Sequence, residues 1–181
     1  YRLIVECREN DLVEYLGRQI PKIYGEDNCT VTQDYIFAKG TIPVILCAHM
    51  DTVFNKPPET VLYDPKQELI WSPEGIGGDD RNGIYTILKI ISGREKDKLP
   101  SVLFTTQEEK GCIGARKAAK PLKAKESISQ SKSTDRVLLM RFSISVRTVS
   151  SSTISVRLDI KKLRVLGQIF AKFVQNGTLL A

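Results

Sequence analysis

Apolar residues in the first two thirds of the chain recur at helical spacing in some segments and in short strand-like runs in others. Over residues 11–24 they return every three or four positions, which predicts an amphipathic helix that Asn10-Asp11 can cap. Its apolar face comprises Leu12, Val13, Leu16 and Ile20.

Shorter apolar runs predict strands. Residues 31–39 have strand composition, and the runs at 44–48 and 102–106 are typical of central strands, the first of them buried on both faces. Residues 61–63 and 69–71 flank Asp64-Pro65-Lys66-Gln67, which is a good hairpin turn.

Helices are predicted between these strands. A glycine-rich loop at residues 75–78 precedes a helix over 81–92, and a further helix is expected over 111–125. Strands that alternate with helices predict the α/β class, with a mixed sheet flanked by helices.

The composition changes in the last third of the chain. The first 115 residues hold 13 Lys+Arg and 18 Asp+Glu, whereas residues 116–181 hold 14 and 3. Serine follows the same division, with three residues before this point and ten after it. Residues 143–157 alternate somewhat like a strand and residues 163–174 are apolar and basic, but neither segment is framed by turn or cap signals. We therefore predict a folded domain over residues 1–120 and a basic, Ser-rich tail over 121–181.

Membrane and secretory features are not evident in the sequence. No apolar run approaches the roughly 20 residues that cross a bilayer, and the N-terminal segment lacks the layout of a signal peptide. The four cysteines are widely spaced and form no C-x-x-C pair, which favours reduced thiols in a cytoplasmic protein.

Candidate chemistry begins directly after the predicted strand 44–48. His49 lies where ligands usually bind an α/β sheet, at the carboxyl end of a strand. A metal-binding imidazole needs an acceptor for its second nitrogen, and Asp51 can supply one. Taken alone, H-x-D is more often a loop or capping histidine.

Two further acidic clusters follow a glycine loop and a strand. Asp79 and Asp80 are consecutive acids that repel each other unless a cation or a helix cap relieves them. Glu108 and Glu109 allow a division of labour, in which one carboxylate binds a metal and the other takes a proton from water. Each pair alone is also compatible with a cap or an exposed acidic turn. Together with His49 they predict one metal site at one sheet edge, suited to zinc, cobalt or manganese.

At these residues the chain resembles the di-zinc peptidases related to aminopeptidases, aminotripeptidase (peptidase T), carboxypeptidase G and aminoacylases. The strings that carry the resemblance, which covers about residues 3–120, are Ala48-His49-Met50-Asp51-Thr52-Val53, Gly78-Asp79-Asp80-Arg81-Asn82-Gly83 and Thr105-Thr106-Gln107-Glu108-Glu109.

The resemblance implies a function and a role for each residue. His49 would bind one zinc ion, Asp79 would bridge two, and Glu109 would bind the second; Asp80 fits the bridging position less well. Glu108 would be the general base and Asp51 would orient His49. The implied activity is hydrolysis of a small peptide or an N-acyl amino acid by a water that two metal ions activate.

The family pattern needs two further ligands, a third carboxylate and a second histidine. The chain has one histidine in all, and the neighbours of Asp135 do not resemble the family strand. A change of reading frame near residues 117–125 would account for these losses together with the charge and serine shift. In that hypothesis the missing aspartate is encoded across Ser133 and Thr134, and the gene sequence tests it.

We therefore expect an incomplete site in a chain of low or no hydrolytic activity. One alternative is an active hydrolase with one metal held by His49, Asp79 and Glu109 or Asp135. Another is a non-enzymatic protein that binds nucleic acid through the basic residues 121–181. That tail has only three aromatic residues and no recognised motif, so nucleic acid is the less favoured partner.

Overall fold

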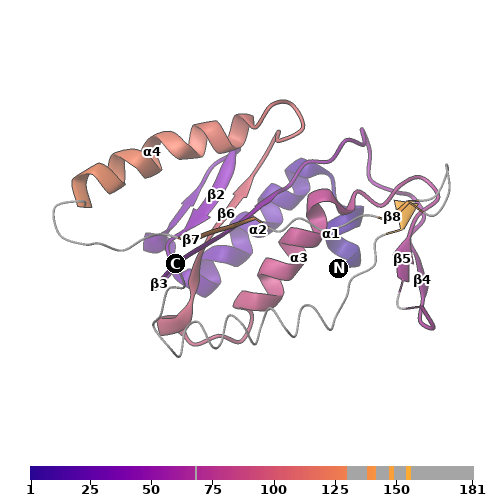
Figure 1. The fold of residues 1–181 in the computed structure, drawn as a ribbon, viewed down its shortest axis with the longest axis horizontal. Coiled ribbons are helices and arrows are strands. Elements are labelled where there is room, and N and C mark those ends of the chain that lie inside the picture. The colour runs from indigo at the N-terminus through magenta and orange to yellow at the C-terminus, as the bar shows by residue number, and fades with distance from the viewer. Residues whose placement is uncertain (68, 130–137, 142–146, 149–153, 156–181) are drawn as a thin grey trace.

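A five-stranded mixed sheet forms the centre of the protein (Figure 1). The computed structural model describes residues 1–67, 69–129, 138–141, 147–148 and 154–155. In spatial order the strands are β1 (Cys29–Val31), β2 (Tyr35–Ala38), β6 (Pro100–Thr105), β3 (Ile42–His49) and β7 (Leu138–Arg141). β3 runs parallel to β6 and β7, while β2 is antiparallel to β1 and β6. The predicted mixed sheet is confirmed.

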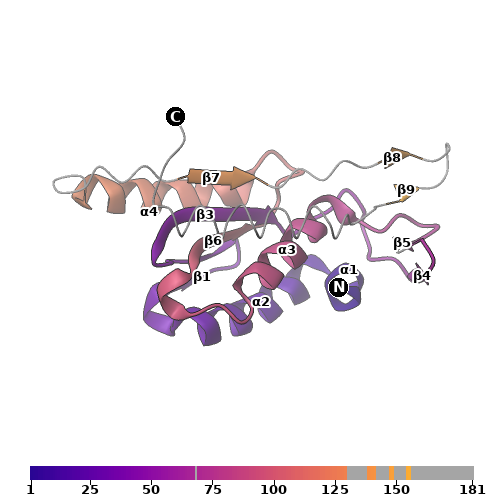
Figure 2. The ribbon, with the colours of Figure 1, turned by 60° about the horizontal axis from the view of Figure 1, so that its bottom comes forward.

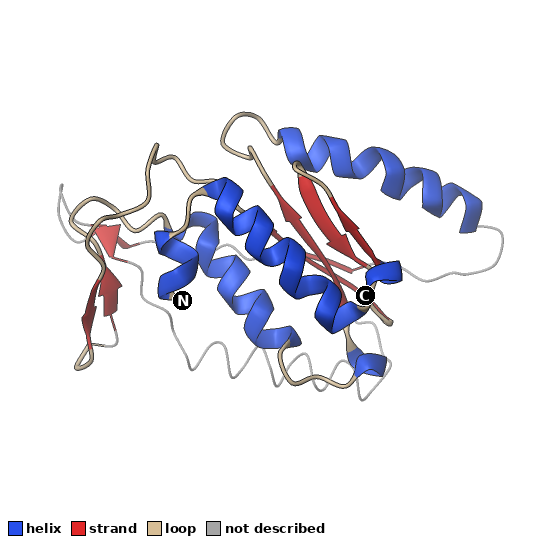
Figure 3. Cartoon of the chain, turned by 180° about the vertical axis from the view of Figure 1, so that it is seen from behind, coloured by secondary structure: helices blue, strands red, loops and turns tan. Residues whose placement is uncertain are grey.

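Helices lie on both faces of this sheet (Figures 2 and 3). α2 (Glu9–Tyr24) and α3 (Gly78–Ile91) pack on one face, and α4 (Ile113–Ser129) lies against β2 and β6 on the other. The short α1 (Arg2–Glu6) contacts α3. Two single 3₁₀ turns, η1 (Glu26–Asn28) and η2 (Lys96–Lys98), connect these elements.

The core forms between α2, α3 and the sheet. Leu12, Leu16 and Ile20 are fully buried, as the helical spacing predicts, and each contributes roughly 1.5–3 kcal/mol by leaving water. The predicted cap is wrong, because the helix starts at Glu9 after Arg8, which makes no side-chain cap bond. Acidic side chains in the first turn favour that start through the helix dipole.

β3 is less enclosed than its apolar sequence predicts. Val44, Leu46 and Ala48 face the core and are buried, whereas Ile45 and Cys47 on the opposite face are only partly buried. The expectation of full burial on both faces is therefore wrong for this strand.

The predicted strand over residues 31–39 is divided in two. The Thr32 hydroxyl donates to the Tyr35 carbonyl at 2.8 Å and accepts from the Asp34 and Tyr35 amides at 3.2 and 3.0 Å. This side chain makes a turn without glycine or proline, so β1 folds back on β2.

The predicted hairpin is present as β4 (Leu62–Asp64) and β5 (Leu69–Trp71). Asp64 closes its turn by accepting from the amides of Lys66 and Gln67 at 2.9 and 3.2 Å.

Part of the segment assigned to the tail lies in regular structure. The boundary at residue 120 falls inside α4, and β7 pairs with residues 44–47 of β3. β8 (Arg147–Thr148) and β9 (Ile154–Ser155) form a small antiparallel pair. The rest of the predicted strand at 143–157, and all of 163–174, lie outside the described residues. In the described part of the chain, no helix combines the length and hydropathy needed to cross a membrane.

Candidate metal centre

The carboxyl ends of β3 and β6 meet at one edge of the sheet. His49 ends β3 and stands in register with Thr105, which ends β6. Beyond the strands, the Met50 amide donates to the Thr105 carbonyl at 2.7 Å, so both chains leave the sheet side by side. Parallel strands place their following loops together, which brings the two predicted clusters into one place.

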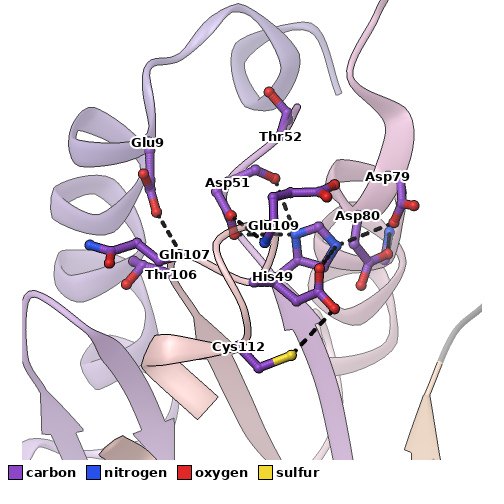
Figure 4. Close-up of polar contacts among 12 residues, drawn as sticks. Glu9, His49, Asp51, Thr52, Asp79, Asp80, Thr106, Gln107, Glu109 and Cys112 are labelled. Atoms are coloured by element: carbon purple, nitrogen blue, oxygen red, sulfur yellow. Dashed lines mark hydrogen bonds and ion pairs between the residues drawn. The ribbon is translucent and has the colours of Figure 1, made fainter. Parts of the chain in front are cut away.

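His49 is buried, with one ring nitrogen directed at each side of the site (Figure 4). Nδ1 lies 3.1 Å from the Asp51 backbone oxygen and 3.3 Å from Oδ1 of the same residue. Nε2 lies 3.3 Å from Asp79 Oδ1 and 4.0 Å from Glu108 Oε2. Loops from three parts of the chain therefore converge on one imidazole.

The position of these oxygens constrains the state of the ring. If Nδ1 carries the proton and donates to Asp51, the lone pair of Nε2 faces the carboxylate oxygens of Asp79 and Glu108. Acceptors that face one another repel unless a proton or a metal cation lies between them. The geometry therefore favours a proton or a metal cation at Nε2.

The pKa of His49 follows from the same surroundings. Burial lowers this pKa. The hydrogen bond and charge of Asp51, with the charges of Asp80 and Glu108, outweigh burial and raise the pKa to about 9. Burial alone raises the pKa of Asp51. The bond with His49 and the amides of Glu108 and Glu109 outweigh burial and lower this pKa to about 2. One of these amides, that of Glu109, donates to Asp51 Oδ2 at 3.0 Å.

Asp79 and Asp80 have different environments at the start of α3. The Asp79 side chain is 79% exposed, and its Oδ1 faces His49. Asp80 is buried and accepts from the Gly83 amide at 3.1 Å, so it is the helix cap of the pair. The pKa of Asp80 is raised to about 7, mainly by burial. The charge of His49 lowers this pKa, and the charge of Asp79 raises it. The peptide bond between the two aspartates is cis.

Gly83 is needed for this cap. A Cβ at this position would lie 2.2 Å from Asp80 Oδ1, well inside contact distance. The glycine lets the carboxylate lie against the helix backbone, which holds the Asp79–Asp80 segment at the sheet edge.

A tight turn presents Glu108 and Glu109. Gln107 and Cys112, on either side of it, have positive φ values of 54° and 58°, which are uncommon for residues with a side chain. The Gly111 and Cys112 amides both donate to the Glu108 carbonyl, at 2.9 and 2.8 Å. Burial raises the pKa of Glu109, and the neighbouring acids Glu108 and Asp79 add to this effect.

All five predicted site residues lie around this edge. Ligand atoms of His49, Glu108 and Glu109 are within 4.8 Å of one another, and Asp79 and Asp51 adjoin the imidazole. Nitrogen and carboxylate oxygens are a donor set that fits zinc. Burial raises the pKa values of Asp80 and Glu109, and the charges of neighbouring acids raise them further, a repulsion that a cation would relieve. The residues present therefore fit a metal ion.

Three neighbours of the site were not predicted from sequence. Cys112 Sγ lies 3.7 Å from Glu108 Oε1, and Glu9 Oε1 accepts from the Gln107 amide at 3.1 Å. Arg81 is a buried cation, 4% exposed. The sequence offered one sign of Arg81, namely a charged residue directly after two acids at the start of a helix. Cys112 and Glu9 reach the site through tertiary contacts that the sequence does not show.

The candidate third acid, Asp135, lies outside the described residues. Ser133 and Thr134, across which the reading-frame hypothesis places an aspartate, lie outside them as well.

Comparisons with known proteins give one resemblance at the level of structure. A solved structure of a tripeptidase from Staphylococcus aureus subsp. aureus Mu50 is similar to this chain, with 19% sequence identity and a TM-score of 0.44. The match covers 62% of this chain and 36% of the tripeptidase chain, so this chain spans about a third of that protein. No protein-family model and no curated protein matches the chain.

Proposed function

We propose that the chain carries the metal site of a hydrolase that acts on peptide or amide bonds. His49, Asp79 and Glu109 are the proposed metal ligands, Asp51 orients His49, and Glu108 is the general base. Zinc is the proposed metal, two ions per complete site, and small peptides or N-acyl amino acids are the proposed substrates.

The environment of His49 is the observation that carries this proposal. One ring nitrogen faces Asp51 at 3.1 Å, and the other faces carboxylates from two separate loops at 3.3 and 4.0 Å. An orienting acid behind a buried imidazole, with acids in front, is the arrangement that metal sites use to fix a histidine ligand. A capping or surface histidine needs neither partner.

Glu108 and Glu109 are placed for different tasks. The Glu108 side chain is 26% exposed and 4.0 Å from His49 Nε2, and its thiol neighbour Cys112 holds one of its oxygens. Glu109 is more open to solvent and has a raised pKa. In the proposed division Glu109 binds the cation, while Glu108 takes a proton from the attacking water and passes it to the leaving amine. A bound zinc would polarise the scissile carbonyl and favour ionisation of water.

A site with one metal is the second candidate. Its support is that His49, Glu108 and Glu109 have ligand atoms within 4.8 Å of one another, which is enough to hold one ion with three protein ligands. In that site Glu108 is a ligand, and Asp79 is not needed.

Low affinity and low activity are expected of this chain. A complete two-metal site needs more ligands than the four acids and one imidazole gathered here, and the chain has no second histidine. Binding of nucleic acid by residues 121–181 stays a prediction, because most of that segment lies outside the described residues.

Zinc titration of the metal-free chain against a competing chelator tests these proposals. We expect weak binding that His49→Ala abolishes and that Glu109→Gln lowers, with Asp97→Asn, an exposed acid on η2, as the unchanged control. Asp79→Asn separates the candidates, because it lowers affinity only where Asp79 is a ligand. Zinc binding that does not respond to His49→Ala contradicts the site. Two tight ions with strong peptide hydrolysis contradict the expected low activity.

A further inference from the structure

The loop that carries Glu108 and Glu109 is held from outside at two backbone positions. The Gln107 amide donates to Glu9 Oε1 at 3.1 Å, and the Glu109 amide donates to Asp51 Oδ2 at 3.0 Å (Figure 4). Glu108 lies between these two amides, so an acid from another part of the chain holds the backbone on each side of it. Asp51 also belongs to the metal centre, whereas Glu9 lies in the first turn of α2.

The hydrogen bonds within the loop do not use the Gln107 amide. The Gln107 carbonyl accepts from the Ile113 amide at 3.1 Å, and the Glu108 carbonyl accepts two amides from the far side of the turn. These bonds close the loop on itself through its carbonyl oxygens. The turn therefore fixes the shape of the loop, and the bond to Glu9 fixes its position relative to α2.

The backbone of Gln107 has a conformation that depends on such support. Its φ of 54° lies in the left-handed region, where a residue with a side chain pays a free energy that the surroundings must offset. Without Glu9, the half-buried amide would lose a charged acceptor, and the turn would lose one of its supports. Gln107 leads directly into Glu108, so a change in this turn moves both carboxylates that follow it.

The position of Glu9 is set in turn by a contact with α3. Arg81, which is 4% exposed, donates from Nη1 to the backbone oxygens of Ile4 and Cys7. These carbonyls lie shortly before the start of α2, where Glu9 stands. Arg81 follows Asp79 by two residues. A continuous series of contacts therefore runs from the start of α3, through the N-terminal segment, to the loop with the two glutamates.

We propose that Glu9 is a positioning residue of the metal centre, which holds the loop of Glu108 and Glu109 in the geometry that binds the ion. Glu9 is not among the residues whose ligand atoms gather at the site, and it is 98 positions away from Gln107 in the chain. It acts through the backbone alone. This inference rests on the proposed function and adds to it an acid that the ion does not touch.

Three variants of the full chain isolate this contact. Glu9→Ala removes the acceptor, and Asp11→Ala is its matched control, because both acids lie in the first turn of α2 and favour the helix start through its dipole. Asp11 is exposed, and Glu9 is the one that accepts from Gln107. Glu9→Gln keeps an oxygen acceptor and removes the charge. Circular dichroism verifies that each variant is folded.

Amide hydrogen exchange, followed by NMR in the metal-free chain, tests the hold on the loop. We expect the Gln107 amide to exchange about tenfold faster in Glu9→Ala, because the loss of one hydrogen bond to a carboxylate corresponds to about that factor. In Glu9→Gln the increase should be about threefold, since a bond to a neutral acceptor is about half as strong. Asp11→Ala should leave this exchange rate unchanged.

Zinc titration of the same variants against a competing chelator tests whether this hold serves the metal centre. The affinity for zinc should fall about tenfold in Glu9→Ala, the size of loss that follows when a residue that orients metal ligands is removed. It should fall about threefold in Glu9→Gln and stay unchanged in Asp11→Ala.

The outcomes separate this proposal from the proposed function. Equal exchange rates in the two alanine variants overturn the role of Glu9, and so does faster exchange with an unchanged affinity for zinc. A loss in Glu9→Gln as large as in Glu9→Ala also overturns it, because the effect would then come from the charge and not from the bond to the loop. An unsubstituted chain that binds no zinc contradicts the proposed function, and faster exchange in Glu9→Ala then still supports the hold of Glu9 on the loop.

Discussion

His49 and Asp51 form a buried pair whose charge state depends on pH in the metal-free protein. The pKa of His49 is raised from 6.5 to about 9, so the proton on this ring stabilises the fold fully below pH 6.5. That contribution is lost as the pH rises through about 9. The pKa of Asp51 is lowered from 3.8 to about 2, so its contribution is present above pH 3.8 and is lost as the pH falls through about 2.

Replacing Asp51 with Asn tests this pair at a single residue. The substitution removes the charge that most favours the imidazolium, so the pKa of His49 should fall by at least about one unit. Proton NMR of the chelator-treated protein measures it directly, because the chain has one histidine and all imidazole ring-proton signals therefore come from His49. Asp27→Asn, an exposed acid on η1, should leave the signal unchanged. An unchanged pKa in Asp51→Asn would show that Asp51 does not face the ring in solution.

At the scale of an element, the start of α3 depends on the contact between Asp80 and Gly83. A methyl group in Gly83→Ala would lie 2.2 Å from Asp80 Oδ1, which pushes the carboxylate off the helix amide. We expect a loss of about 1–3 kcal/mol in the free energy of unfolding, measured by urea denaturation, because a cap is lost and a buried acid is left without its donor.

A glycine-to-alanine substitution at Gly17 should not lower the free energy of unfolding. Gly17 lies inside α2, and its added methyl would meet only the Val31 methyl at 2.9 Å, on a side chain that is 47% exposed and can move. Gly17→Ala should therefore be neutral or stabilise by up to about 1 kcal/mol through helix propensity. Equal losses of stability at both positions would mean that the contact with Asp80 does not require glycine at position 83.

The elements also show which parts of the fold the sequence could predict. The spacing of Leu12, Leu16 and Ile20 requires only local periodicity, and α2 buries these three residues as that periodicity predicts. The break at Thr32 could not be predicted in this way, because a hydroxyl replaces the usual glycine or proline of a turn.

The candidate site was predictable for a different reason. His49 and Glu108 each follow an apolar strand, and parallel pairing of β3 with β6 brings strand ends together without any knowledge of side-chain contacts. Arg81 and Cys112 could not be found this way, because a buried cation and a half-buried thiol have no periodic signal. Arg81 is held by the backbone oxygens of Ile4 and Cys7, and Cys112 by its contact with Glu108.

At the scale of the whole molecule, the composition of residues 121–181 indicates a separate tail, whereas strand pairing places part of this segment in the central sheet. The charge balance separates this segment from the rest, yet β7 pairs with residues 44–47 of β3. With this pairing, β3 is an inner strand of the sheet. Without it, β3 is an edge strand with unpaired backbone groups beside the metal centre.

Two truncated chains distinguish these states. A chain that ends at Ser129 lacks β7, and we expect it to have a lower melting temperature and to self-associate through the open edge of β3. A chain that ends at Arg141 keeps β7 and should stay closer to the full chain on both counts. Light scattering coupled to size-exclusion chromatography measures association, and thermal denaturation measures stability. If the two truncated chains behave alike, β7 contributes nothing to the sheet, and the charge asymmetry marks the true limit of the folded unit. If only the shorter chain melts earlier and self-associates, residues 138–141 complete the sheet that holds His49 in place, although the segment is basic and rich in serine.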